Sequence, residues 1–263
     1  MLKKKLVLVL FLFCCLLFVE DTSWAQKGNT GNVLPNLGIN IGSSNNPTDI
    51  ALSLQVLLLL TILSLAPAII IMTTSFIRIA IVFSFTRTAL ALQQMPPNQV
   101  IMALALFLTF FIMAPTFNEV YEKAYIPFKE KKIDAEEFYE RSMEPIREFM
   151  FRQIGDSDKD KEILVPFIQM GNLKWPNSEA DVPTYVLIPA FMLNELKKAF
   201  YMGIIIFIPF IIIDMIVASV LMSMGMIMLP PVMVSLPFKI ILFVLVDGWG
   251  LLVQQLILSF NVR

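Results

Sequence analysis

Long apolar runs dominate the chain and are separated by one stretch rich in charge. Residues 50–77 carry no charge and include LQVLLLLTILSLAPAIIIM, which is long enough for one membrane span with a kink at Pro67. The uncharged stretch 88–118 includes a second run, NQVIMALALFLTFFIMAP, and further apolar segments cover 199–222 and 235–260. This pattern predicts an all-α membrane protein with about four hydrophobic helical segments.

The residues between the first two runs are more polar. Residues 73–92, TTSFIRIAIVFSFTRTALAL, contain Arg78 and Arg87, which face opposite sides of a helix because they are nine positions apart. We therefore expect a connecting or interfacial helix here and assign 50–118 to a first hydrophobic hairpin that includes it.

Charge is concentrated in the middle of the chain. Residues 119–181 hold 25 of the 41 charged residues, 15 acidic and 10 basic. The pattern predicts a water-exposed module at 119–184, helical through DAEEFYERSMEPIREFMFRQ. Residues 185–263 then form a second hydrophobic hairpin, with a methionine-rich stretch as its turn.

The N-terminus is typical of a signal peptide. Three lysines, Lys3–Lys5, precede the apolar run 6–19, and Ser23-Trp24-Ala25 supplies small residues at the two positions that a signal peptidase reads. We predict a signal peptide at 1–25, with an uncleaved anchor helix as the alternative. Residues 26–49 are rich in Gly, Asn, Ser and Pro and are expected to form a flexible exported segment.

The predicted signal peptide sets the expected orientation of the chain in the membrane. If the mature N-terminus lies outside, four crossings place Arg78 and Arg87 inside, which agrees with the positive-inside rule. The charged module and the C-terminus then lie on the outer side of the membrane.

Composition supports the membrane class and excludes several chemistries. The chain is 57% hydrophobic and 16% charged, against roughly 45–50% and 25% in soluble domains, and its mean hydropathy is +0.74. The net charge of −1 argues against nucleic acid as a partner. Both cysteines, Cys14 and Cys15, lie in the predicted signal, and the chain has no His. We therefore expect no enzyme, metal or cofactor, although carboxylate catalysis stays formally open.

Four ionisable residues lie in or beside apolar runs: Glu195, Asp214, Lys239 and Asp247. A charge at the bilayer centre costs about 2.5–3.5 kcal/mol on insertion scales. One interpretation is a proton or solute pathway through the two aspartates. The other, which we favour, is structural, with either aspartate paired to Lys239, to Arg78 or to another chain. Glu195 is interpreted as part of the interfacial start of the third segment.

Residues 222–231 read MSMGMIMLPP and supply the turn of the second hairpin. Gly225 and Pro230-Pro231 let this segment leave helical geometry. The methionines are Met222, Met224, Met226 and Met228. Composition alone favours a lipid-facing helix end here, while a deformable apolar seal is the alternative.

Long segments of the chain resemble the FliP family, the flagellar members of the FliP/SctR export-gate proteins of type III secretion. The resemblance runs in order from about residue 50 to 262. It is carried by TSFIRIAIVFSFTRTAL, PPNQVIMALALFLTFFIMAP, AYIPF, EPIREFMFRQ, FIPFIIIDMIVASVLMSMGMIMLPP and LPFKIILFVLVDGWGLLVQQLILSF.

The resemblance implies a pentameric subunit that joins FliQ and FliR in an export gate at the flagellar basal body. It implies FlhA and FlhB as further components, FliO as an assembly factor, and unfolded flagellar subunits as the transported substrates. The resemblance further implies an inner-membrane protein whose helices, in the assembled pore complex, wrap helically and lie largely above the ordinary plane of the membrane. It also implies that the charges pack between subunits: Arg78, Arg87, Asp214, Lys239 and Asp247.

In this family the methionine loop is a gasket around the closed pore. The family pattern has three consecutive methionines after the glycine, whereas this chain has the stiffer Ile227 in the middle position. The resemblance therefore puts most weight on Met226 and Met228.

Three other functions remain open at this point. The first is the homologous subunit of a virulence secretion apparatus, against which the predicted signal and the large exported module argue. The second is an ion-coupled transporter using Asp214 and Asp247, for which we find no internal repeat. The third is a purely structural assembly factor.

Overall fold

The computed structural model describes residues 47–260 except 93, 156, 158–160, 177 and 227, with side-chain surroundings from Leu54 onward. The predicted signal peptide, and residues 26–46 of the predicted flexible segment, lie outside the described residues. All regular elements in the described part are helical, so the predicted all-α class is confirmed.

By internal contacts the chain forms two units, Met1–Val56 and Leu57–Arg263. The described part of the first unit is the start of helix α2 (Pro47–Thr73).

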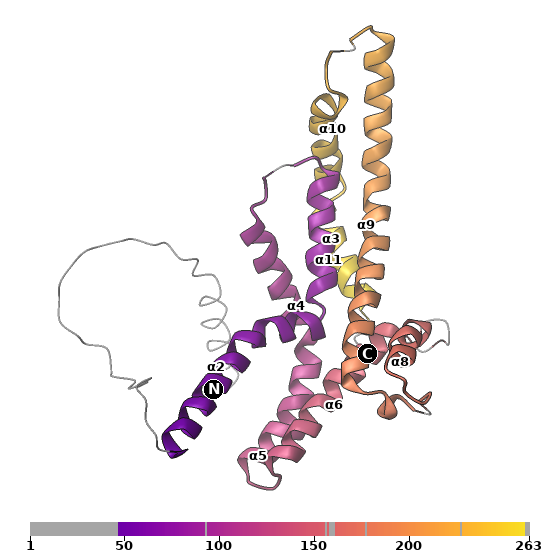
Figure 1. The fold of residues 1–263 in the computed structure, drawn as a ribbon. Helices are drawn as coiled ribbons and strands as arrows, with labels where there is room; N and C mark the ends of the chain where they lie inside the picture. The colour runs from indigo at the N-terminus through magenta and orange to yellow at the C-terminus, as the bar shows by residue number, and fades with distance from the viewer. Residues whose placement is uncertain are drawn as a thin grey trace, which may run out of the picture. The chain divides into compact units, whose positions relative to one another are not determined.

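Helix α3 (Phe76–Ala89) lies at the centre of the second unit. It packs along α9 (Thr184–Ser223) and against α4 (Asn98–Val120) (Figure 1). Helices α3 and α9 approach closely at Gly203, where an added Cβ would lie 2.6 Å from the ring of Phe85. The buried residues of α3 are Phe76, Arg78, Ile79, Val82, Phe83, Thr86 and Ala89.

The sequence predicted a connecting or interfacial helix within 73–92, and α3 connects α2 to α4. Helices α4 and α9 pack against α3, and most of its polar side chains form hydrogen bonds within the protein. Thr86, for example, is fully buried and donates a hydrogen bond to the carbonyl of Val82 at 2.9 Å.

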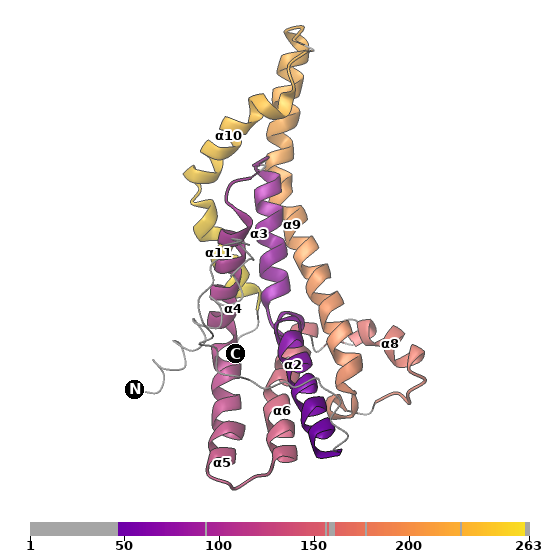
Figure 2. The ribbon, with the colours of Figure 1, turned by 60° about the vertical axis from the view of Figure 1, so that its left-hand side comes forward.

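Helix α9 has 40 residues. At 1.5 Å per residue it is about 60 Å long, roughly twice the ~30 Å hydrocarbon core of a bilayer. Its first part packs against α6 (Ala135–Ile154), and its later part against α3 and α10 (Pro231–Leu245) (Figure 2). One helix therefore joins the charged module to the methionine loop.

Helices α10 and α11 (Gly248–Ser259) form the returning limb of the second hairpin and meet at a 62° bend. Asp247 occupies the bend with a φ of 50°. An added Cβ at Gly250 would lie 2.3 Å from the Asp247 carboxylate, so this exposed side chain would have to move to accommodate it.

The charged module follows α4, which continues through a π-helical turn (η1, Tyr121–Tyr125) into α5 (Ile126–Lys129). Helix α6 then begins after Asp134, whose carboxylate accepts a hydrogen bond from the Glu137 N–H at 2.8 Å. The prediction of a helix through this stretch is confirmed. Short helices complete the module: η2 (Glu162–Leu164), α8 (Val165–Met170) and η3 (Glu179–Asp181).

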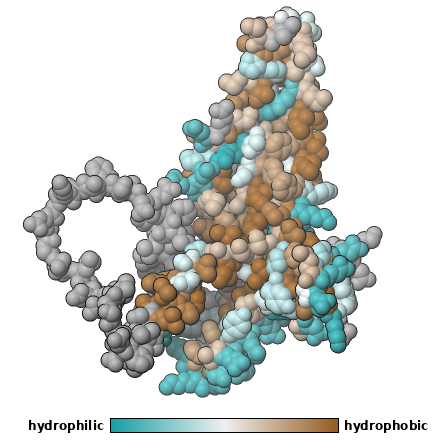
Figure 3. Space-filling view, viewed as in Figure 1, coloured by the Kyte–Doolittle hydropathy of each residue, from teal (hydrophilic) through white to brown (hydrophobic). Residues whose placement is uncertain are grey.

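Three helices in the described residues are long and apolar enough to cross a membrane: Leu54–Thr73, Asn98–Lys129 and Thr184–Ser223. The bent pair α10 and α11 raises the number to four if it acts as one span, as the apolar pattern predicted. Figure 3 shows apolar surface along α9 and hydrophilic surface over α5, α6 and α8. The exposed stripe on α9 includes Ile204, Ile208, Ile212 and Ile216.

Candidate functional site

The methionine-rich stretch is an exposed connection between α9 and α10. Gly225 has a φ of 73°, its N–H bonds the Met222 carbonyl at 3.1 Å, and the Met226 N–H bonds the Leu221 carbonyl at 2.9 Å. This pair of bonds is a Schellman motif, which needs a left-handed residue at the position of Gly225. Pro230 and Pro231 then start α10, where a missing N–H costs nothing.

All four methionines of this stretch expose their side chains in the single chain. Met228 is 97% exposed, and an added Cβ at Gly225 would meet no atom within 4 Å. The other exposed fractions are 70% for Met222, 66% for Met224 and 43% for Met226. The loop therefore presents deformable apolar side chains that this chain does not cover.

Asp214 and Lys239 form an ion pair that joins the two limbs of the second hairpin. The Lys239 Nζ lies 2.6 Å from Oδ2 of Asp214, and the hydroxyl of Ser235 donates to the other carboxylate oxygen at 2.5 Å. Lys239 also approaches the Ala89 carbonyl at the end of α3, at 3.4 Å. Its side chain is 3% exposed and that of Asp214 is 30% exposed.

Arg78 is the centre of a second, fully buried polar cluster. Its Nε donates to Glu195 Oε2 at 2.8 Å, and its Nη2 contacts the other oxygen of the same carboxylate. Its Nη1 donates to the Ser259 carbonyl at 2.9 Å, and its Nη2 to the Gln153 side chain at 3.3 Å. The guanidinium also lies 3.9 Å from the centroid of the Phe260 ring. One side chain thereby connects α3, α6, α9 and the end of α11.

Sequence reasoning missed the partner of Arg78. Glu195 was interpreted as interfacial because Lys197 and Lys198 follow it, yet its side chain is fully buried. A signal was present in the sequence, since Arg78 and Glu195 each adjoin a long apolar run and carry opposite charges.

The remaining two predicted charges have different surroundings. Arg87 is half-buried and donates to the Asn98 side chain at 2.5 Å, which links the end of α3 to the start of α4. Asp247, which the family resemblance places at a contact between subunits, is exposed in the single chain. It lies at the bend between α10 and α11 with its carboxylate beside Gly250, and it forms no ion pair with any described residue.

Arg147 in the charged module holds the segment that precedes α9 through two hydrogen bonds. Arg147 of α6 donates to the Thr184 hydroxyl at 2.7 Å and to the Val182 carbonyl at 2.6 Å. Burial lowers the pKa of Arg147 below its ordinary value.

Within the described residues, no group of three or more His, Cys, Asp or Glu side chains could hold a metal ion. The fold and the site define a helical protein with several membrane-spanning segments, buried ion pairs between helices and an exposed apolar loop. The profile of the FliP family matches residues 59–256. The chain belongs to the FliP family.

Similar proteins match over most of the chain. The flagellar biosynthetic protein FliP of Borreliella burgdorferi is 59% identical over 213 residues, covering 81% of this chain and 83% of that protein. The Bacillus subtilis protein of the same name is 55% identical, covering 84% of this chain and 98% of that protein. The Treponema pallidum protein of the same name is 47% identical, covering 95% of this chain and 94% of that protein.

Proposed function

We propose that the chain is a pore subunit of the flagellar type III protein export gate. Several copies surround a channel through which unfolded flagellar subunits leave the cytoplasm, and the methionine loops seal it when it is closed. The observation that carries the seal is the exposure of all four loop methionines at the turn between α9 and α10. FliP-family membership supports the export role.

Methionine suits a seal of this kind because it is unbranched, apolar and adaptable. A ring of such side chains excludes water and ions when packed together, and separates without breaking hydrogen bonds when a polypeptide passes. The Schellman end of α9 and the prolines of α10 hold both ends of the loop, so the side chains move while the backbone anchors stay in place.

The resemblance to export-gate proteins supplies the expected assembly. We infer a pentamer that binds FliQ and FliR, works with FlhA and FlhB, and needs FliO during assembly. The exposed stripe Ile204, Ile208, Ile212 and Ile216 on α9 offers apolar surface for such contacts. We place the assembly in the inner membrane at the flagellar basal body, with the charged module 119–184 on the outer side. The role is transport without catalysis.

An ion-coupled transporter is less well supported. That function would use Asp214 and Asp247 as successive sites. Asp214 is engaged by Lys239 and Ser235, while Asp247 lies on the exposed bend between α10 and α11.

The seal is tested by replacing Met226 and Met228 with Ala in the assembled complex. Removing each buried Met from water contributes about 1.5–3 kcal/mol, so losing even one such contribution weakens the closed state by ten-fold or more. We expect normal assembly with increased ion conductance in lipid bilayers. Leu replacements should leak less, because they keep most of the volume and apolarity.

The matched control changes two exposed methionines outside the loop, Met95 and Met170, to Ala. The ion conductance of this variant should be the same as that of the unchanged protein. If the loop variant assembles and conducts no more than this control, the seal is disproved and the loop is an ordinary helix connection.

A further inference from the structure

Exposed methionines are concentrated at one end of the hairpin formed by α9 and α10. Figure 1 and Figure 2 show this end projecting beyond α3. It spans only 215–233, and its methionines are between 43% and 97% exposed. They are Met215, Met222, Met224, Met226, Met228 and Met233. One short segment thus presents several thioethers that this chain does not cover.

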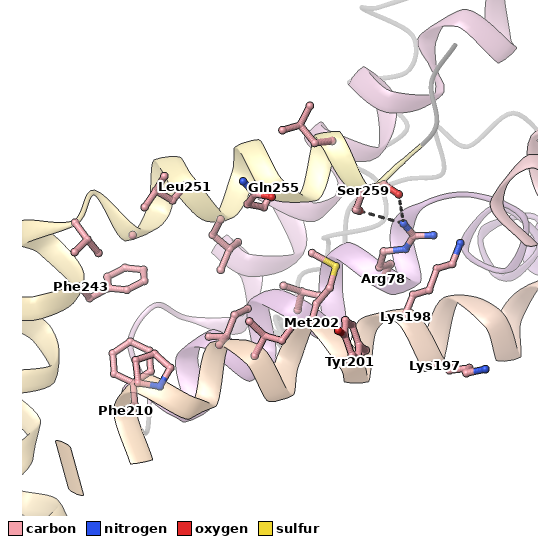
Figure 4. Close-up of a pocket in the computed structure, with 18 of the residues that line it drawn as sticks. Arg78, Lys197, Lys198, Tyr201, Met202, Phe210, Phe243, Leu251, Gln255 and Ser259 are labelled. Atoms are coloured by element: carbon pink, nitrogen blue, oxygen red, sulfur yellow. Dashed lines mark hydrogen bonds between the residues drawn. The ribbon is translucent and has the colours of Figure 1, made fainter. Parts of the chain in front are cut away.

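Methionines that hold the fold together are covered by other side chains. Met113 and Met150 are completely excluded from solvent. Met202 on α9 is half-buried, and Figure 4 shows it in the cavity between α9 and α11. A small solute therefore reaches the sulfur atoms of the hairpin end in the single chain, while those of Met113 and Met150 are shielded.

No thiol competes with these thioethers for an oxidant. Both cysteines, Cys14 and Cys15, lie in the predicted signal peptide, so residues 26–263 contain none. Hydrogen peroxide transfers one oxygen atom to a methionine sulfur: the O–O bond breaks, the sulfur is oxidised to the sulfoxide, and the peroxide is reduced to water. The product is a polar side chain, and methionine sulfoxide reductases convert it back to the thioether.

We propose that the methionine loop is a site of reversible oxidation, at which hydrogen peroxide opens the seal. The proposal rests on the sealing function described above. Met228 is the first target, because it is 97% exposed. A seal across a channel has water on both of its faces, so peroxide reaches the outermost sulfur atoms in the closed complex. A sulfoxide oxygen loses free energy when it is stripped of water, so oxidised side chains stay hydrated where thioethers exclude water.

The test exposes the assembled complex in lipid bilayers to hydrogen peroxide and then to methionine sulfoxide reductases A and B. Peptide mass spectrometry locates each sulfoxide, and bilayer recording measures the ion conductance. We expect sulfoxide to form first at Met228, and not at Met113 or Met150. The conductance should rise about ten-fold, the factor expected when one buried methionine is lost from the seal. The reductases should reverse the rise.

The matched variant carries Leu in place of all four loop methionines. Leu keeps most of the volume and apolarity but has no sulfur to oxidise, so peroxide should not change the conductance of this variant. The control variant carries Met95→Leu and Met170→Leu, which remove exposed methionines outside the hairpin end. Peroxide should raise its conductance as much as that of the unchanged protein.

Three results would overturn the proposal and leave the seal in place. The first is oxidation of the loop methionines in the closed complex no faster than that of Met113 and Met150. The second is an unchanged conductance once sulfoxide has formed at Met226 and Met228, in a protein whose Ala variant leaks. The third is an equal rise in the variant with four Leu residues, because the leak then arises elsewhere. An Ala variant that stays tight would instead disprove the seal, and the oxidation site with it.

Discussion

The guanidinium of Arg78 binds the carboxylate of Glu195, 117 residues further along the chain, and both side chains are completely excluded from solvent. Two fully desolvated charges are tolerated only when each compensates the other. The remaining guanidinium donors are directed to Gln153 and Ser259, so the pair also fixes where α6 and α11 end relative to α3 and α9.

Breaking this pair should destabilise the fold strongly. Arg78→Met or Glu195→Leu should each cost about 3–5 kcal/mol, because the other charge stays buried and unpaired. The double variant should cost clearly less than the sum of the two single costs. Thermal unfolding in detergent, followed by circular dichroism, measures all three. Lys132→Met is the control, because its ion pair with Glu130 is exposed and contributes at most about 1 kcal/mol.

The apolar runs were sufficient to predict the helical class and the four hydrophobic segments. The pattern of the charged stretch was sufficient to predict the helix that the structure shows as α6. Both properties are local, so each can be read from one window of the chain. Prolines did not stop α9, which continues through Pro189 and Pro209.

Properties that depend on distant residues were harder to predict. Helix α3 has arginines on opposite faces, and no local pattern identifies the partner of either one. Those partners are Glu195 in α9 and Asn98 at the start of α4. The bend at Asp247, where the chain takes a positive φ between α10 and α11, is marked by no local pattern.

Gly203 should tolerate no side chain. A Cβ there would lie 2.6 Å from the Phe85 ring, so Gly203→Ala should cost about 1–3 kcal/mol by overpacking, despite the better helix propensity of Ala. Phe85→Leu in the same chain should remove the clash, so the double variant should be no less stable than Phe85→Leu alone. Additive losses in thermal unfolding would show that the two sites do not contact.

Asp214→Ala should impair assembly before it affects transport. The substitution leaves Lys239 buried without its partner, and we expect it to lower the stability by about 2 kcal/mol. Breaking a fully buried pair costs ~3–5 kcal/mol, but Asp214 is 30% exposed, so the loss here is smaller. The comparison variant is Asp247→Asn, because Asp247 is exposed and Asn also tolerates the positive φ at this position. We expect the yield of complex with partner subunits to fall only for Asp214→Ala. Normal yield with lost export would favour a proton relay.

The predicted signal peptide is tested directly on the mature protein. N-terminal sequencing should begin at or near Gln26, because Ser23 and Ala25 place small residues before that position. Retention of the first five residues on most molecules would show an uncleaved anchor instead.

Arg147 should hold the segment before α9 against α6. Its guanidinium contacts the Thr184 hydroxyl and the Val182 carbonyl, and its Nη2 also lies 3.1 Å from the Glu179 carbonyl. Lys cannot reproduce these contacts from one planar group, so Arg147→Lys should expose the segment 171–183 to faster limited proteolysis. The control is Arg141→Lys on the same helix, whose ion pair with Glu137 is 43% exposed on both sides and spans one helical turn. That change should leave the cleavage rate unaltered. Equal rates for both variants would mean that the segment is held by apolar packing, such as that of Val182, and not by the arginine.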